Sequence, residues 1–129
     1  MSTTIKKLPG EPIVIHAMSS DYKLVDELPK SFPKLLEFLG TLEEPVFWLV
    51  DISAVAVITV EDLLTGTELV ARGEHALYRH PKIKYVVYIS TSSMIKMAVD
   101  GMTKEAFGKF PISIFNTLDE ALAFARKKE

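Results

Sequence analysis

Short apolar runs along the chain alternate with longer segments in which apolar residues recur at helical spacing. The clearest run covers residues 46–50, Val-Phe-Trp-Leu-Val, and its unbroken apolarity is typical of a strand covered on both faces. β-branched and aromatic residues predict two later strands, over residues 83–89 and 111–115. We therefore expect the run at 46–50 to be a central strand of a sheet.

The first eighteen residues predict a hairpin. A weakly alternating segment, residues 3–8, is followed by the turn pair Pro9-Gly10 and by a β-branched run over residues 12–18. Two strands joined by so short a turn are expected to pair in an antiparallel manner.

Residues 22–42 combine helical spacing with two prolines. Because proline lacks an N–H and clashes with the preceding turn, Pro29 and Pro33 are expected to prevent one long helix. The sequence instead predicts a short turn over residues 23–28 and then a helix that begins at Ser31. The apolar stripe of that helix consists of Leu35, Leu36, Leu39 and Leu42.

Three further helices are predicted, one after each of the strands at residues 46–50, 83–89 and 111–115. Thr59 is the expected N-cap of the second helix, and Ser92 or Ser93 that of the third. Thr117 and Glu120 form a capping-box pattern at the start of the last helix. The expected buried face of the second helix consists of Val60, Leu63, Leu64, Thr67, Val70, Ala71, Leu77 and Tyr78.

The predicted element order is therefore ββαβαβαβα, which places the chain in the α/β class. Strands that alternate with helices favour right-handed crossovers and a mostly parallel sheet. The length of 129 residues is typical of one domain. We predict a single domain over residues 1–129, with an N-terminal hairpin and about four helices.

Composition narrows the function more than it identifies it. The chain has no cysteine, which excludes disulfides, thiolate metal sites and a cysteine nucleophile. A net charge of −2 argues against general nucleic-acid binding, which depends on a strongly basic face. No apolar run is long enough to span a membrane and no signal-peptide pattern opens the sequence, so a cytoplasmic protein is expected.

The usual motifs of catalysis and cofactor binding are missing from the sequence. The three histidines lack the spacing of a zinc site, and no glycine pattern for a dinucleotide or a phosphate occurs. The Gly-x-Ser-x-Gly turn of hydrolases is also lacking. The sequence therefore predicts no cofactor, no metal site and no catalytic residue.

Polar residues follow the predicted strands, where ligands of open α/β sheets tend to bind. Asp51 and Ser53 follow the central strand, and a run of hydroxyls that includes Ser90 and Ser92 follows the next one. One interpretation is a small-ligand site, since free N–H groups at a helix start favour an anion. The other is that these residues are ordinary helix caps and turn formers.

A family resemblance rests on residues 49–58, Leu-Val-Asp-Ile-Ser-Ala-Val-Ala-Val-Ile, and the helix after them. This segment resembles the central strand and turn of STAS domains, the anti-sigma-factor-antagonist fold. The family pattern is an apolar strand that ends in Asp-Leu-Ser-Gly-Val, followed by Asp-Ser-Ser-Gly at a helix start. The predicted element order is similar to the SpoIIAA-like branch, which is related to STAS/SEC14 proteins. The resemblance implies a SpoIIAA-like fold.

The motif match is partial. Asp51 and Ser53 match the strand end, whereas Ala54 stands where glycine is usual. The segment Thr59, Val60, Glu61 and Asp62 occupies the second motif, so Glu61 stands in place of the family's phosphorylatable serine. Phosphorylation of such a serine adds about −1.5 to −2 charge at a helix start. Glu61 either holds a permanent negative charge there or has lost the role.

The leading hypothesis from the sequence is a non-catalytic regulatory module that binds a protein partner through residues 53–63. The alternative is a small-molecule or lipid-binding domain, which the SEC14 side of the resemblance favours. The methionines of the first strand pair and the third helix also favour it: Met18, Met94, Met97 and Met102. An enzyme is the third hypothesis.

Self-association is a further hypothesis. If residues 3–8 lie at the sheet edge, their unpaired backbone can pair with a second copy to form a homodimer. Lys6 and Lys7 in that segment would instead block such pairing.

Overall fold

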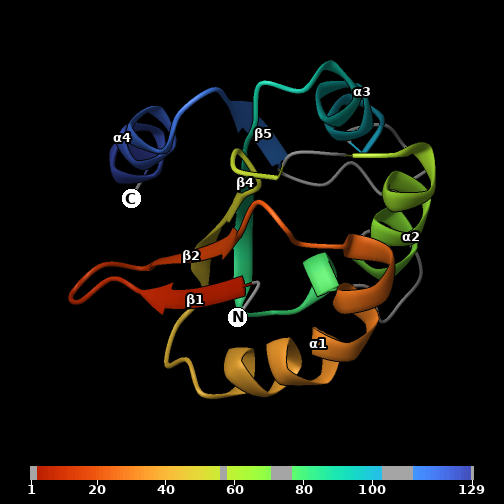
Figure 1. The fold of residues 1–129 in the computed structure, drawn as a ribbon. Helices are drawn as coiled ribbons and strands as arrows, with labels where there is room; N and C mark the ends of the chain where they lie inside the picture. The colour runs from red at the N-terminus through yellow and green to blue at the C-terminus, as the bar shows by residue number, and fades with distance from the viewer. Residues whose placement is uncertain (1–2, 56–57, 71–76, 103–111, 129) are drawn as a thin grey trace.

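The structure is a computed structural model, and it describes residues 3–55, 58–70, 77–102 and 112–128. These residues form a five-stranded sheet in the order β1-β2-β3-β4-β5 (Figure 1). β1 is antiparallel to β2, and every later pair of neighbours is parallel. The strands are β1 (Thr3–Lys7), β2 (Ile13–Met18), β3 (Val46–Asp51), β4 (Ile83–Ile89) and β5 (Ile112–Phe115).

Helices lie on both faces of the sheet. α4 packs on one face, against β3, β4 and β5, while α1, α2 and α3 lie together on the other side (Figure 1). The bounds are α1 (Leu24–Gly40), α2 (Val60–Val70), the 3-10 helix η1 (Leu77–Arg79), α3 (Ser93–Met102) and α4 (Leu118–Lys128). The predicted α/β class and the order ββαβαβαβα are confirmed, with η1 as an addition.

β3 is the centre of the core, as its unbroken apolar run predicts. Trp48 and Val50 belong to the cluster under α1, α2 and α3, whereas Phe47 and Leu49 belong to the cluster under α4. Every residue from Val46 to Val50 is buried. Alternate residues of a strand point to opposite faces, so a strand covered on both sides must be apolar at every position.

The prediction that two prolines break the first helix is wrong. α1 runs continuously from Leu24 to Gly40 with Pro29 and Pro33 inside it. The prolines are four residues apart and both exposed, so they share the outer face of the helix. On the inner face Leu28, Leu35 and Leu39 are buried, and this packing outweighs the backbone bonds that the prolines remove. The ribbon of α1 changes direction along its length in Figure 1, as proline kinks explain.

The predicted buried face of the second helix is also partly wrong. Val60 and Leu64 are 64% and 65% exposed, and Leu63 is the half-buried residue that packs on the core. Leu77 and Tyr78 are buried, but they belong to η1 and not to α2. Thr67 and Val70 have no described side chains, and Ala71 lies outside the described residues.

The N-terminal hairpin is confirmed. Ile5 lies opposite His16 in the antiparallel pair, and Gly10 adopts a φ of 73° that favours glycine in the turn. β1 is the edge strand of the sheet. Pairing of β1 with a second copy stays a prediction.

Candidate ligand-binding site

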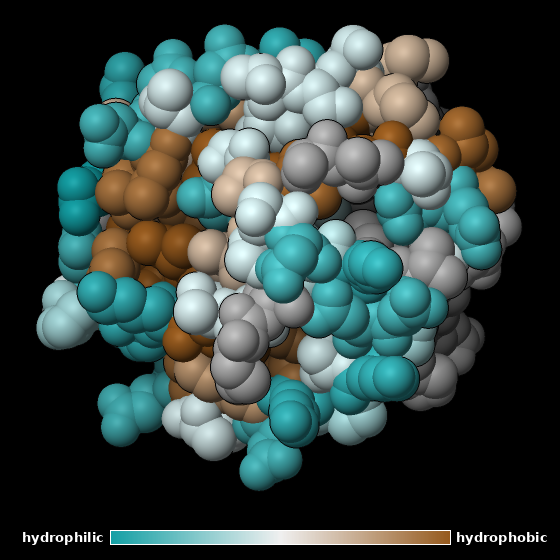
Figure 2. Space-filling model, viewed as in Figure 1, coloured by the Kyte–Doolittle hydropathy of each residue, from teal (hydrophilic) through white to brown (hydrophobic). Residues whose placement is uncertain are grey.

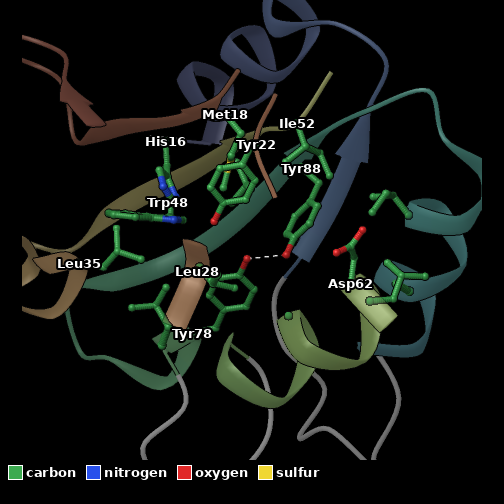
Figure 3. Close-up of a pocket in the computed structure, with 16 residues that line it drawn as sticks. His16, Met18, Tyr22, Leu28, Leu35, Trp48, Ile52, Asp62, Tyr78 and Tyr88 are labelled. Carbon is green, nitrogen blue, oxygen red and sulfur yellow. Dashed lines mark hydrogen bonds between the residues drawn. The ribbon is translucent and has the colours of Figure 1, made fainter. Parts of the chain in front are cut away.

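A cavity of about 60 Å³ lies between the sheet and the three helices α1, α2 and α3 (Figure 3). One water needs about 10–15 Å³ on this scale, so the space exceeds a single water. Most of the lining is apolar or aromatic. The lining residues are His16, Met18, Tyr22, Leu28, Leu35, Trp48, Val50, Ile52, Asp62, Leu63, Gly66, Leu77, Tyr78, Tyr88, Ile95 and Ala98.

Three buried polar atoms in this lining have no hydrogen-bond partner among the described residues. They are His16 Nε2, the Tyr22 hydroxyl and Trp48 Nε1. These side chains are 3%, 5% and 0% exposed, so solvent at the surface does not satisfy them. An unsatisfied buried polar group costs about 1–3 kcal/mol, and native proteins retain few of them. Three around one cavity therefore point to an occupant that bonds them.

Strand register brings two of these groups together. His16 of β2 and Trp48 of β3 project to the same face of neighbouring parallel strands, and their ring centroids are 5.8 Å apart. Tyr22 follows β2 and lies in the same lining. Trp48 Nε1 can only donate a hydrogen bond, whereas the Tyr22 hydroxyl can donate or accept.

Burial sets the charge state of two of the three groups. Desolvation lowers the pKa of His16 to about 4, so its imidazole is neutral at pH 7. Desolvation, with the carboxylate of Glu27 as a smaller cause, raises the pKa of Tyr22 to about 12. The Ser31 hydroxyl lowers that pKa as a smaller, opposing cause. Ser31 Oγ donates to the Leu28 carbonyl at 3.1 Å, and the Tyr22 hydroxyl has no hydrogen bond among the described residues. The cavity wall is therefore polar but almost uncharged at this end.

The opposite end of the cavity carries a hydroxyl pair and a carboxylate. The Tyr78 and Tyr88 hydroxyls are 2.6 Å apart, and burial raises the pKa of Tyr88 to about 12. In Figure 3 the hydroxyls of Tyr22, Tyr78 and Tyr88 and the carboxylate of Asp62 point toward the middle of the cavity. Asp62 Oδ2 accepts a bond from the Thr59 N–H at 2.9 Å, which fixes this carboxylate at the start of α2.

The predicted residues at the strand ends form turns and caps. Asp51 Oδ1 accepts bonds from the Ser53 N–H at 3.1 Å and from the Ser53 hydroxyl at 2.5 Å. Ser90 Oγ accepts from the Ser92 N–H at 3.0 Å, and Ser92 Oγ accepts from the Ile95 N–H at the start of α3. Asp51 pairs with Ile89 across β3 and β4. The turn at Asp51 and the hydroxyls of Ser90 and Ser92 therefore lie side by side at the carboxyl ends of these two strands. The lining of the cavity includes none of these four residues, Asp51, Ser53, Ser90 and Ser92.

The four predicted residues at the start of α2 lie in different environments. Thr59 is the N-cap, since its Oγ1 accepts from the Asp62 N–H at 3.0 Å. Val60 and Glu61 are exposed on the outer side of the helix. Asp62 is the one member of the predicted set that lines the cavity. Of the three methionines whose side chains are described, only Met18 lines it, and Met97 is 75% exposed. Nothing is described of the Met102 side chain.

Within the described ranges, no group of three or more His, Asp or Glu side chains is placed to hold a metal ion. Within the same ranges, no helix combines the length and the apolarity needed to cross a bilayer.

The fold of this chain is similar to that of known proteins, although its sequence matches no known family model. No protein-family model matches the chain, and no curated protein sequence matches it significantly. Among solved structures, an uncharacterized DUF3478-family protein with a SpoIIAA-like fold from Shewanella loihica PV-4 aligns at a TM-score of 0.63 and 17% identity, over 95% of this chain and 91% of that one. An anti-sigma factor antagonist from Mycobacterium paratuberculosis aligns at a TM-score of 0.53 and 20% identity, over 96% and 92%. At these identities the likeness concerns the fold alone, and the chain has the STAS/SpoIIAA-like fold that its element order predicts.

Proposed function

We propose that this chain binds a small, largely apolar molecule in the cavity under α1, α2 and α3. The observation that carries the proposal is the group of three buried, unpartnered polar atoms around an otherwise apolar space. Ligand sites combine an apolar lining with a few polar groups that fix orientation, and this cavity has that composition.

The polar atoms define what the ligand must contain. Trp48 Nε1 needs an acceptor, and a carbonyl, ether or hydroxyl oxygen on the ligand supplies one. The neutral imidazole of His16 and the Tyr22 hydroxyl do not require a charged ligand atom. Ordered water is the competing occupant, because waters also bond to unsatisfied buried groups. Adding a probe that has an alkyl chain and one polar end distinguishes a ligand site from a site that holds only water.

Trp48 offers a direct measurement, since it is the only tryptophan in the sequence and lies in the cavity wall. We expect octan-1-ol to bind with saturation and to change the emission of Trp48. Ala98→Leu adds bulk at the cavity wall on α3 and is expected to weaken octanol binding at least tenfold. Ala123→Leu is the matched control, because Ala123 is exposed on α4 on the other face of the sheet.

A linear, non-saturating response of Trp48, or equal binding by the Ala98→Leu variant, would overturn the proposal. Urea unfolding of each variant shows whether it is folded under the binding conditions. If Ala98→Leu does not fold, Tyr22→Phe replaces it and is expected to weaken octanol binding, because it removes one of the three polar atoms. Native mass spectrometry of freshly purified protein gives an independent measurement, with a retained small molecule as the expected result.

A second candidate is the protein-binding module that the sequence favours. The exposed start of α2 supports it, because Val60 and Leu64 are adjacent on one helix face and each is about two thirds exposed. In Figure 2 hydrophobic atoms are visible at the edge of the molecule where Figure 1 places α2. One structural neighbour is named an anti-sigma factor antagonist, a name that gives another protein as its target.

Glu61→Lys tests this second candidate, because Glu61 is exposed beside Val60 and its reversal leaves the cavity lining unchanged. If α2 docks on a partner, the variant is expected to retain at least tenfold less of that partner than the wild type does in a pull-down from native lysate. Glu37→Lys on α1 is the control, since Glu37 is also exposed. Equal retention by Glu61→Lys and the wild type would argue against docking through α2.

A further inference from the structure

A second hollow adjoins the cavity, between the edge strand β1 and helix α1. This cleft has a volume of about 610 Å³, within the range of small-molecule sites. His16, Tyr22 and Leu35 line both the cleft and the inner cavity. These three side chains therefore form the wall where the two spaces meet, and two of them carry an unpartnered polar atom.

Two lysines stand along the cleft. Lys30 and Lys34 are one turn apart on α1, both are exposed, and both line the cleft. Neither forms an ion pair with any residue that the structure describes. Their charges are therefore available to a ligand in the cleft.

Two carboxylates, one in the cleft and one in the inner cavity, affect how a charged ligand is oriented. Glu27 also lines the cleft, but its Oε2 accepts a 2.6 Å bond from the Lys23 N–H and so caps the start of α1. Asp62 lines the inner cavity and is held by the Thr59 N–H. An anion is repelled by Asp62 in the inner cavity, whereas in the cleft the two lysines outnumber the single carboxylate of Glu27 and attract it. The lining of the inner cavity is the more apolar of the two, so the inner cavity is the better place for an apolar chain.

We propose that the ligand is an anionic amphiphile whose apolar chain lies in the cavity and whose acidic head lies in the cleft beside Lys30 and Lys34. This inference rests on the proposed function, because it needs the cavity to be the binding site. It adds the charge of the ligand, its orientation and the side of the molecule through which it enters. The polar atoms of the shared wall lie between chain and head, where an amphiphile carries its first polar atoms.

The test compares octanoate with octan-1-ol by the emission of Trp48, at concentrations where neither aggregates. The two probes share a chain and differ in head charge. Octanoate is expected to bind about tenfold more tightly than octanol at low salt, and added NaCl is expected to reduce this difference. The double variant Lys30→Gln/Lys34→Gln is expected to lose the difference while its octanol affinity stays within about twofold.

Lys6→Gln is the matched control, because Lys6 is exposed on β1 and does not line the cleft. It is expected to preserve the preference for octanoate. If octanol binds as tightly as octanoate, or the double variant keeps the preference, the inference is wrong and the proposed function stands. If neither probe gives a saturable response, the proposed function itself is wrong.

Discussion

Replacement of Leu39 by alanine is expected to lower the free energy of unfolding by about 2–5 kcal/mol. Leu39 is 0% exposed on the inner face of α1 and belongs to the core cluster that contains Trp48. The substitution removes buried methyl groups and leaves a void that rigid neighbours fill only in part. Urea unfolding followed by circular dichroism measures the change, with an unaltered m-value as the sign that both states keep their compactness.

Leu36→Ala is the control for this prediction. It makes the same chemical change on the same helix, but Leu36 is 38% exposed. Part of its side chain is already in water, so we expect a loss of about 1 kcal/mol or less. Similar losses for the two variants would contradict the packing of α1, because the side chains of residues 36 and 39 would then be equally buried.

The element order was predictable because it depends on local patterns. The apolar run at 46–50 requires a strand with two covered faces, and the caps at Thr59, Ser92 and Thr117 mark three helix starts. The error in α1 has a different origin. Local propensity disfavours Pro29 and Pro33 in a helix, and only the packing of Leu28 and Leu35 against the sheet reverses that preference.

The candidate site was largely missed because its residues meet only through long-range pairing. The sequence shows His16 and Trp48 as single polar interruptions in apolar runs, and either is compatible with an ordinary core position. In the register of β2 and β3, Val14 lies opposite Trp48, and His16, two residues after Val14, points to the same face. A single sequence does not reveal this register. Asp62 was predicted only because residues 59–62 occupy the second motif of the family resemblance. Asp51 and Ser53 were predicted because they follow the central strand and match the family's strand end, and they form a turn outside the cavity.

The stability of the protein is expected to fall by about 2 kcal/mol between pH 7 and pH 5 because of His16 alone. Desolvation holds the pKa of His16 at about 4 in the folded state, against an ordinary value of 6.5. Between these two values the unfolded chain binds a proton that the folded chain does not. The contribution is therefore intact above pH 6.5, is lost progressively below it, and totals about 3 kcal/mol near pH 4.

Carboxylates also change the stability of the protein near pH 4, but not between pH 7 and pH 5. Arg126 lowers the pKa of Glu11, and Ser19 lowers that of Asp21, from ordinary values of 4.5 and 3.8. Stability from such groups is present above the ordinary value and is lost only as the pH falls toward the lowered one. Urea unfolding at pH 7, 6 and 5 therefore isolates the histidine.

His16→Leu completes the experiment, because leucine has a similar volume and no ionisable group. Its free energy of unfolding is expected to vary little between pH 7 and pH 5. At pH 7 the variant also reports on Nε2: an atom without a partner makes leucine at least as stable as histidine, whereas a bonded occupant makes the variant less stable. A wild-type stability that is flat over the same pH range would contradict the burial of His16. Because the pKa of Tyr22 is about 12 and that of His16 about 4, octanol binding is expected to stay constant between pH 7 and pH 5. It is expected to change only below about pH 5, where His16 becomes protonated.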